Sequence, residues 1–109
     1  MSELAQRKCR PCAQGTPPLT AERAQQLLTQ LAGWEVLEGT RLRKQLTLAD
    51  FMSVIRLVNR IAEVAEADDH HPDLHLTGYR RLTIELATHA IGGLSENDFI
   101  LAAKIDALQ

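Results

Sequence analysis

The feature that most constrains the fold of this chain is a long amphipathic segment in its middle, from Leu48 to about Ala67. Apolar side chains recur there at intervals of three and four residues, which is the spacing of one face of an α-helix. They are Phe51, Val54, Ile55, Val58, Ile61, Ala62 and Ala65. Thr47 and Asp50 have the spacing of a capping box, so we expect the helix to begin there. An apolar face of this length needs a second layer of structure to cover it.

Strand patterns flank the predicted helix on both sides. Before it, Trp34–Leu37 and Leu42–Leu46 are separated by a short turn that contains Gly39, which predicts a β-hairpin. After it, Asp73–Thr77 and Arg81–Thr88 predict a second hairpin. In the last of these segments apolar and polar residues alternate, which is the period of a half-buried strand. Because the strands of a hairpin run antiparallel, the sequence predicts an antiparallel sheet.

Two further helices complete the predicted order α-β-β-α-β-β-α. Thr20 can cap a helix that runs to about Ala32. Ser95 and Asp98 form a second capping box, at the start of a helix that ends near Leu108. Three amphipathic helices need a surface to cover, so we expect a two-layer α+β domain.

Length and charge restrict the class of protein. The chain has 109 residues, 45% of them hydrophobic, so we expect one domain with a thin core. Association into a homodimer or homotetramer would bury more apolar surface. The 12 basic and 14 acidic side chains give a formal net charge of −2, which argues against binding to nucleic acid or to an anionic membrane. The basic residues Arg41, Arg43, Lys44, Arg80 and Arg81 are interpreted as solvated strand residues.

The N-terminal part of the sequence differs in composition from the rest. It lacks the apolar run of a secretory signal, and no run of about 18 apolar residues occurs anywhere, so we expect a cytoplasmic protein without a membrane partner. Residues 1–18 are expected to be a flexible tail, and residues 19–109 the domain. The tail contains both cysteines, Cys9 and Cys12. Their thiolates supply half of a structural zinc site, so zinc would need histidines or a second chain. A redox pair and a mobile tail with two reduced thiols are the other interpretations, and we favour the last.

Acidic residues and histidines gather where the long helix is expected to end. Glu66, Asp68 and Asp69 lie at its C-terminus, where the negative end of the helix dipole makes acidic side chains unfavourable. Such violations of a local rule are typical of functional sites. The helix end and the carboxylates both favour a protonated imidazole at His70 or His71, which could act as an acid near neutral pH.

The remaining histidines are assigned by strand parity. His89 shares the parity of Glu85, so we expect it to lie outside the core. His75 is expected to face solvent for the same reason. Asp98 already has a structural explanation in its cap with Ser95.

Together these residues resemble the signature of a known family. The pattern is Glu66, three residues, His70-His71-Pro72, six residues, Tyr79, nine residues, His89, eight residues and Asp98. It resembles the signature of the pterin-4a-carbinolamine dehydratases, also called 4a-hydroxytetrahydrobiopterin dehydratases. The resemblance continues through residues 73–76, 92–99 and 102–106 and covers about Leu19 to Leu108. It implies a four-stranded antiparallel sheet with three helices on one face.

The resemblance implies an enzyme that dehydrates a reduced pterin. The substrate carries a hydroxyl at C4a, left after an aromatic amino acid hydroxylase has used the pterin. Loss of that hydroxyl and of the N5 proton gives the quinonoid dihydropterin, which requires an acid and a base but no metal and no other cofactor. By resemblance His70 and His89 exchange these protons, and Glu66 holds an imidazole in the right tautomer. His71 is the remaining catalytic candidate. The further substrate contacts that the resemblance implies are Pro72, Tyr79, Thr88, Ala90, Ile91 and Asp98.

Other relatives imply a role without catalysis. One group resembles assembly factors for RuBisCO in carboxysomes and plastids, and an animal relative is a dimerisation cofactor of a homeodomain activator. The usual mark of a non-catalytic relative is loss of the histidine motif, and here His70, His71 and His89 are all present. The sequence therefore favours the enzyme and leaves a carboxysome-associated RuBisCO assembly factor as the alternative.

Overall fold

The helices and strands follow one another in the order that the sequence predicts. The structure is a computed structural model that describes residues 4–9 and 17–109 of the chain. Its elements are η1 (Leu4–Gln6), α1 (Ala21–Leu28), β1 (Glu35–Leu37), β2 (Arg41–Thr47), α2 (Phe51–Asp68), β3 (Asp73–Thr77), β4 (Arg81–Leu86), η2 (His89–Ile91) and α3 (Glu96–Asp106). The predicted α+β class is confirmed.

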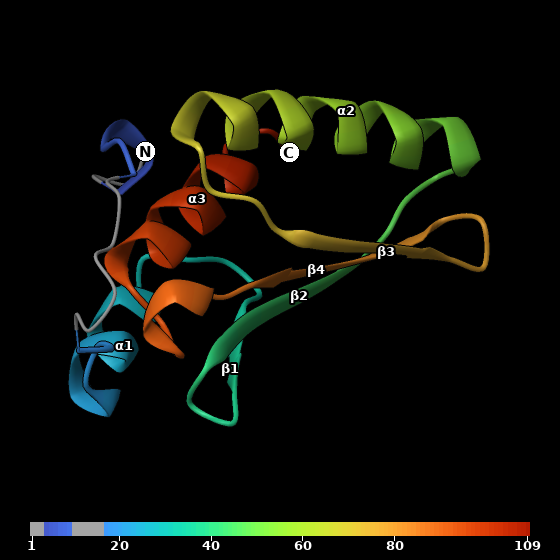
Figure 1. Ribbon diagram of the computed structural model, residues 1–109. Coiled ribbons are helices and arrows are strands. Elements are labelled where there is room, and N and C mark those ends of the chain that lie inside the picture. The colour runs from blue at the N-terminus through green and yellow to red at the C-terminus, as the bar shows by residue number, and fades with distance from the viewer. Residues whose placement is uncertain (1–3, 10–16) are drawn as a thin grey trace.

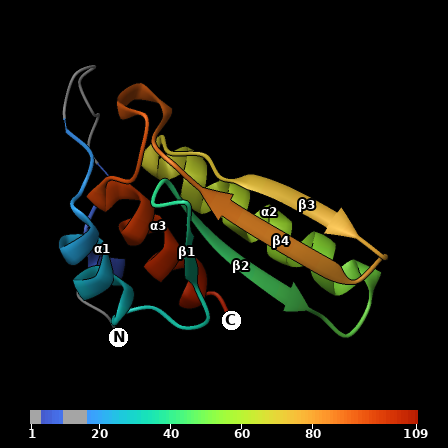
Figure 2. The same cartoon turned by 90° about the horizontal axis from the view of Figure 1, so that it is seen from below.

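The strands form one antiparallel sheet in the order β1-β2-β4-β3. The two hairpins lie side by side because β2 pairs with β4, with Leu42 opposite Leu86. Figures 1 and 2 show α2 and α3 across one face of the sheet, with α1 beside α3. The other face carries mainly polar side chains, among them Arg43 and Thr83. The sheet is therefore half-buried, as the alternation in β4 predicts.

The core lies between the sheet, α2 and α3. The sheet contributes Leu42, Leu82, Ile84 and Leu86, and α2 contributes Val54, Leu57, Ile61 and Ala65. Burying one such side chain stabilises the fold by ~1.5–3 kcal/mol. In α3 every residue from Asn97 to Ala103 is buried, together with Ile105. Because α3 is the central helix, the polar side chains that it carries can reach both the sheet and the end of α2.

Two local predictions need correction. Thr47 does not cap α2, because it pairs with Arg81 as the last residue of β2 and its backbone belongs to the strand. The cap is Asp50, whose Oδ1 accepts a hydrogen bond of 2.7 Å from the backbone N–H of Ser53. Lys44 is not a solvated strand residue, because only 8% of it is exposed. It shares the inner face of β2 with Leu42.

The first residues of the chain pack against α3. Leu4 is 2% exposed and Cys9 is 6% exposed, so both belong to the core. Arg7 Nη1 donates to Glu96 Oε1 at 3.1 Å, and this hydrogen bond is the main cause that lowers the pKa of Glu96. The segment Leu4–Cys9 thus lies against the domain, whereas Cys12 and its neighbours in residues 10–16 lie outside the described residues. The predicted flexible tail covered residues 1–18, and it stays a prediction for residues 1–3 and 10–16.

Candidate active site

The C-terminus of α2 turns sharply and places two consecutive histidines on opposite sides of the chain. Asp69 adopts a left-handed conformation with φ 50°, and its N–H donates back to the carbonyls of Ala65 and Glu66. The side chain of His70 is 12% exposed and points inward, while that of His71 is 55% exposed. The two imidazoles therefore have different environments and cannot share one role.

His70 is held by a carboxylate that is fully buried. Its Nε2 lies 2.6 Å from Oδ1 of Asp98, and the side chain of Asp98 is 0% exposed. The other carboxylate oxygen, Oδ2, accepts hydrogen bonds from Thr88 Oγ1 at 2.8 Å and from the backbone N–H of Ser95 at 3.0 Å. Thr88 Oγ1 and Ser95 Oγ lie 2.7 Å apart, so the hydroxyls belong to the same network.

Asp98 has two functions at the start of α3. Its bond to the N–H of Ser95 completes the predicted capping box, which is confirmed. The same carboxylate orients His70 across 28 positions of sequence. In the described part of the chain no lysine or arginine forms an ion pair with Asp98. When Nε2 of His70 donates to Asp98, Nδ1 is the ring nitrogen left to exchange a proton with another group.

Glu66 pairs with His71 rather than with His70. Its Oε1 lies 2.6 Å from Nε2 of His71, and both side chains are largely exposed, at 78% and 55%. An exposed ion pair contributes ~0–1 kcal/mol. In this arrangement Asp98 is the carboxylate that orients the inward-pointing imidazole, and Glu66 could act only on the outward-pointing one.

His89 lines a small pocket beside this network. It begins η2 and is exposed, as are Ala90 and, in part, Ile91. The pocket has a volume of about 290 Å³ and is lined by Thr40, Arg41, Ala87, Thr88, His89, Gly92 and Gly93. Thr88 belongs to both the pocket and the hydrogen-bond network, so it connects His89 to Asp98 and through Asp98 to His70.

The loop that carries His89 is closed by its two glycines. Gly92 has φ 67°, a left-handed conformation that favours glycine. Gly93 pairs with Thr88 in an isolated antiparallel bridge. A Cβ atom at Gly93 would lie only 2.9 Å from Cβ of Pro18, so a larger residue would displace the loop.

Tyr79 lies away from the other candidates. It sits in the turn between β3 and β4, at the end of the sheet remote from η2 (Figure 1), and it is 63% exposed. The chain does not bring it together with the histidines, so its contact with a substrate stays a prediction. Pro72 directly follows His71 and is half-buried. His75 is exposed, as the strand parity predicts.

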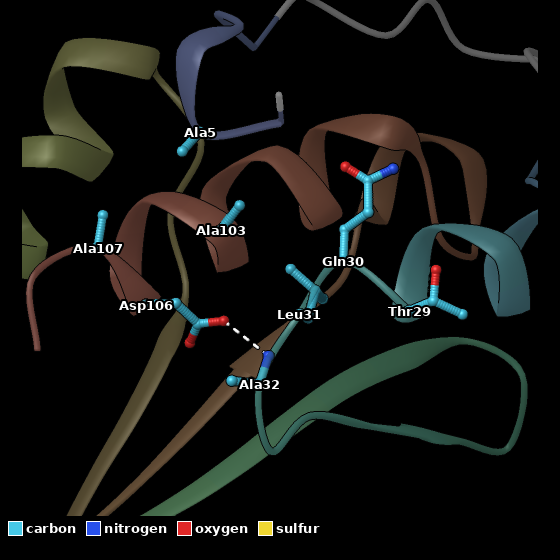
Figure 3. A pocket seen from close by; sticks show the side chains of 8 residues that line it. All are labelled: Ala5, Thr29, Gln30, Leu31, Ala32, Ala103, Asp106 and Ala107. Atoms are coloured by element: carbon cyan, nitrogen blue, oxygen red, sulfur yellow. Dashed lines mark hydrogen bonds between the residues drawn. The ribbon is translucent and has the colours of Figure 1, made fainter. Parts of the chain in front are cut away.

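A second carboxylate network, at the other end of α3, was missed from the sequence. Asp106 accepts hydrogen bonds from the N–H of Ala32 at 3.0 Å, from Nε1 of Trp34 at 2.8 Å and from Nζ of Lys44 at 2.7 Å. Figure 3 shows Asp106 at the edge of a pocket between α3 and the segment after α1, with the bond to Ala32 drawn. This pocket, of about 300 Å³, is lined largely by small side chains and no histidine. The parity of Lys44 with Leu42 was the signal that could have revealed the buried lysine.

Two classes of site find no support in the described residues. Among residues 4–9 and 17–109, no cluster of three or more His, Cys, Asp or Glu side chains could hold a metal ion. No helix in these ranges is both long and apolar enough to cross a membrane.

Relatives agree on one family. The sequence profile described as "Pterin 4 alpha carbinolamine dehydratase" matches residues 17–108. The chain is 45% identical over 108 residues to a protein of Nitrosospira multiformis provisionally named as such a dehydratase, with 99% of this chain and 94% of that protein covered. It is 43% identical over 113 residues to pterin-4-alpha-carbinolamine dehydratase 2, mitochondrial, of Arabidopsis thaliana, with 100% of this chain and 60% of that protein covered.

Solved structures agree with the fold. A "transcriptional coactivator/pterin dehydratase" from Brucella melitensis superposes with a TM-score of 0.78 at 30% identity, covering 84% of this chain and 97% of the other. A pterin dehydratase-like RuBisCO assembly factor of the α-carboxysome superposes with a TM-score of 0.59 at 20% identity, covering 71% and 89%. The second likeness concerns the fold alone. With a profile match over most of its length and curated relatives above 40% identity, the chain belongs to the pterin-4-alpha-carbinolamine dehydratase family.

Proposed function

We propose that this protein dehydrates a reduced pterin that carries a hydroxyl at C4a, with His70 and His89 as the groups that transfer protons. The observation that carries the proposal is the chain of contacts from His70 through the buried Asp98 to Thr88, which adjoins His89 in the pocket. Imidazoles exchange protons near neutral pH, and the reaction needs one acid and one base.

The chemistry balances without an oxidant or reductant. The C4a–O bond breaks as the hydroxyl accepts a proton and leaves as water. A base removes the proton from N5, and the C4a=N5 double bond forms. The two histidines can supply both functions, one as the acid and the other as the base. The pocket beside His89 has a volume of about 290 Å³, near the lower end of the ~300–1,000 Å³ that is usual for ligand pockets.

The other predicted site residues support this arrangement to different degrees. Asp98 acts as a positioning residue, because it contacts His70 and is itself fully buried. Thr88, Ala90 and Ile91 lie at the pocket or in η2 beside it, where they would contact the pterin. Glu66 and His71 are exposed and Pro72 is half-buried; next to His70 in sequence, they would orient the ring.

The wider setting of the reaction is also a proposal. We expect a homodimer or homotetramer in the cytoplasm, acting on pterins released by an aromatic amino acid hydroxylase. RuBisCO assembly, with carboxysome association, is the competing hypothesis. Its support is a fold likeness at 20% identity, and no feature of the described residues favours it.

The test is a stopped-flow measurement with 4a-hydroxytetrahydropterin generated in situ. The purified protein should accelerate dehydration in the presence of a metal chelator, and His89→Ala should lose ~10²–10⁴ of that rate, the usual contribution of a positioned acid or base. A folded parent protein with the rate of buffer alone would overturn the proposal. The assembly factor would then become the leading hypothesis.

A further inference from the structure

A second contact ties the end of α2 to α3, close behind His70. Lys104 Nζ on α3 lies 2.5 Å from Oδ2 of Asp68, the last residue of α2. The side chain of Asp68 is 5% exposed and that of Lys104 is 20% exposed, so the pair is mostly removed from water. Asp68 precedes His70 by two residues. The end of α2 is therefore fixed to α3 at two points, by Asp68–Lys104 and by His70–Asp98.

Cys9, at the end of the N-terminal segment Leu4–Cys9, lies beside this ion pair. Cys9 Sγ donates to the carbonyl of Asn97 at 3.5 Å. Burial, followed by the nearby carboxylate of Asp68, raises the pKa of the Cys9 thiol to about 12. The short helix η1 packs against α3 (Figure 1). Arg7 holds the segment to α3 through Glu96.

The Asp68–Lys104 pair lies where it can affect the position of His70 as well as stability. The C-terminus of α2 bears the partial negative charge of the helix dipole and three carboxylates, and Lys104 supplies the opposing charge. Removing one partner of a buried ion pair leaves an uncompensated charge and is strongly destabilising. Loss of Lys104 would therefore weaken the attachment of the last turn of α2 to α3, and His70 follows that turn by two residues. A displacement of ~1 Å at a catalytic group can cost about 10²-fold in rate.

We propose that Lys104 and the segment Leu4–Cys9 are positioning elements for His70, which hold the end of α2 against α3 so that the imidazole meets Asp98. This inference depends on the proposed function only for its kinetic consequence. The family profile begins at residue 17, so the segment is a part of the site support that the matched region does not contain. Cys9 thereby gains a structural role at the contact between this segment and α3.

The first experiment compares Lys104→Met with Lys44→Met. Lys44, on β2, forms a similar ion pair at 2.7 Å with Asp106, which lies on α3 as Lys104 does. The hydrogen-bond network of Asp106 contains no histidine. Both variants should melt below the parent. Only Lys104→Met should lower kcat per folded molecule, by about tenfold or more with little change in KM, and Lys104→Arg should recover most of it. Equal kcat in the two methionine variants would overturn the proposal.

A second measurement does not require any activity. In protein labelled with ¹⁵N-histidine, Lys104→Met should shift the imidazole nitrogen signals of His70, whereas Lys44→Met should leave them at the parent positions. This readout separates the two proposals, because it stays informative if the parent has no dehydratase activity. Unchanged His70 signals in Lys104→Met would show that the ion pair does not position the imidazole.

Alkylation of Cys9 tests the segment itself, in a Cys12→Ser background. A buried thiol with a raised pKa reacts slowly with iodoacetamide, because the thiolate is the nucleophile. Arg7→Gln, which removes the bond to Glu96, should raise the alkylation rate, and the alkylated protein should show the displaced His70 signals of Lys104→Met. Alkylated protein with parent signals would exclude the segment from the support of His70.

Discussion

Each end of α3 carries a carboxylate that accepts three hydrogen bonds, but the donors differ between the two ends. At the N-terminal end Asp98 accepts from a backbone N–H, a hydroxyl and an imidazole. At the C-terminal end Asp106 accepts from a backbone N–H, an indole and an ammonium group. Each carboxylate joins elements that lie far apart in the sequence. Each has three hydrogen-bond partners, which offset the cost of removing the fully buried Asp98 and the partly buried Asp106 from water.

The two networks differ in the charged or titratable side chain that donates to the carboxylate, which is His70 at Asp98 and Lys44 at Asp106. Nζ of Lys44 lies 5.9 Å from the ring centroid of Trp34, a contact that favours a cation. Histidine, unlike lysine, is the residue type that proteins use to transfer protons near neutral pH. Burial and hydrogen-bond geometry alone would therefore not separate the two networks. The chemistry of the third partner does.

The largest expected effect is a loss of dehydration rate when the imidazole that is hydrogen-bonded to Asp98 is replaced. His70→Gln keeps an amide that can donate to the carboxylate but cannot act as an acid or base. Dehydration should slow by ~10²–10⁴ while the melting temperature stays near that of the parent. His70→Ala should slow the reaction to a similar degree. If either variant kept more than a tenth of the parent rate, the hydrogen-bond network around Asp98 would not be the catalytic one.

The next effect is on stability, at the other network. Asp106→Ala leaves the ammonium of Lys44 and the indole of Trp34 without their acceptor in a buried environment. The free energy of unfolding should fall by ~3–5 kcal/mol, the usual cost of breaking a buried ion pair. Denaturant titration measures this. The rate per folded molecule should be unchanged, and a large kinetic defect would contradict a purely structural role.

Matched amide substitutions sharpen the contrast. Asp98→Asn and Asp106→Asn make the same isosteric change, and each should lower the free energy of unfolding by ~1–3 kcal/mol. Only Asp98→Asn should also reduce kcat, because it alters the hydrogen bond that selects the tautomer of His70. Comparable kcat values in the two variants would mean that Asp98 acts only as the cap of α3.

The smallest effect is expected at the histidine outside both networks. His75→Ala removes an exposed side chain on the polar face of the sheet, so stability should change by no more than ~0.5 kcal/mol and the rate should not change. Thermal melting and the stopped-flow assay check this together. A rate defect as large as that of His89→Ala would place the pocket on the other face of the sheet.

Local patterns predicted the elements, and distant contacts decided the site. The hairpins, the long helix and the cap of Ser95 and Asp98 follow from periods and spacings within about 20 residues. That the capping carboxylate also faces His70 depends on how the end of α2 packs against α3, which no local pattern encodes. Glu66 was expected to act on an imidazole, and the structure pairs it with His71, five positions away, because the turn after α2 directs the His70 ring inward. The pair of Lys44 and Asp106 spans 62 positions and was equally hidden.

The turn after α2 has a consequence for how this sequence can vary. His70 and His71 face opposite ways because they are neighbours in a segment that Pro72 keeps out of the helical conformation. The length of that segment, more than its composition, decides which imidazole points inward. Insertion of one residue between Asp69 and His70 should change which ring points inward, and deletion of one residue between Asp69 and Pro72 would remove one of the two histidines. Homologous chains should therefore tolerate substitutions around this turn far better than changes in its length.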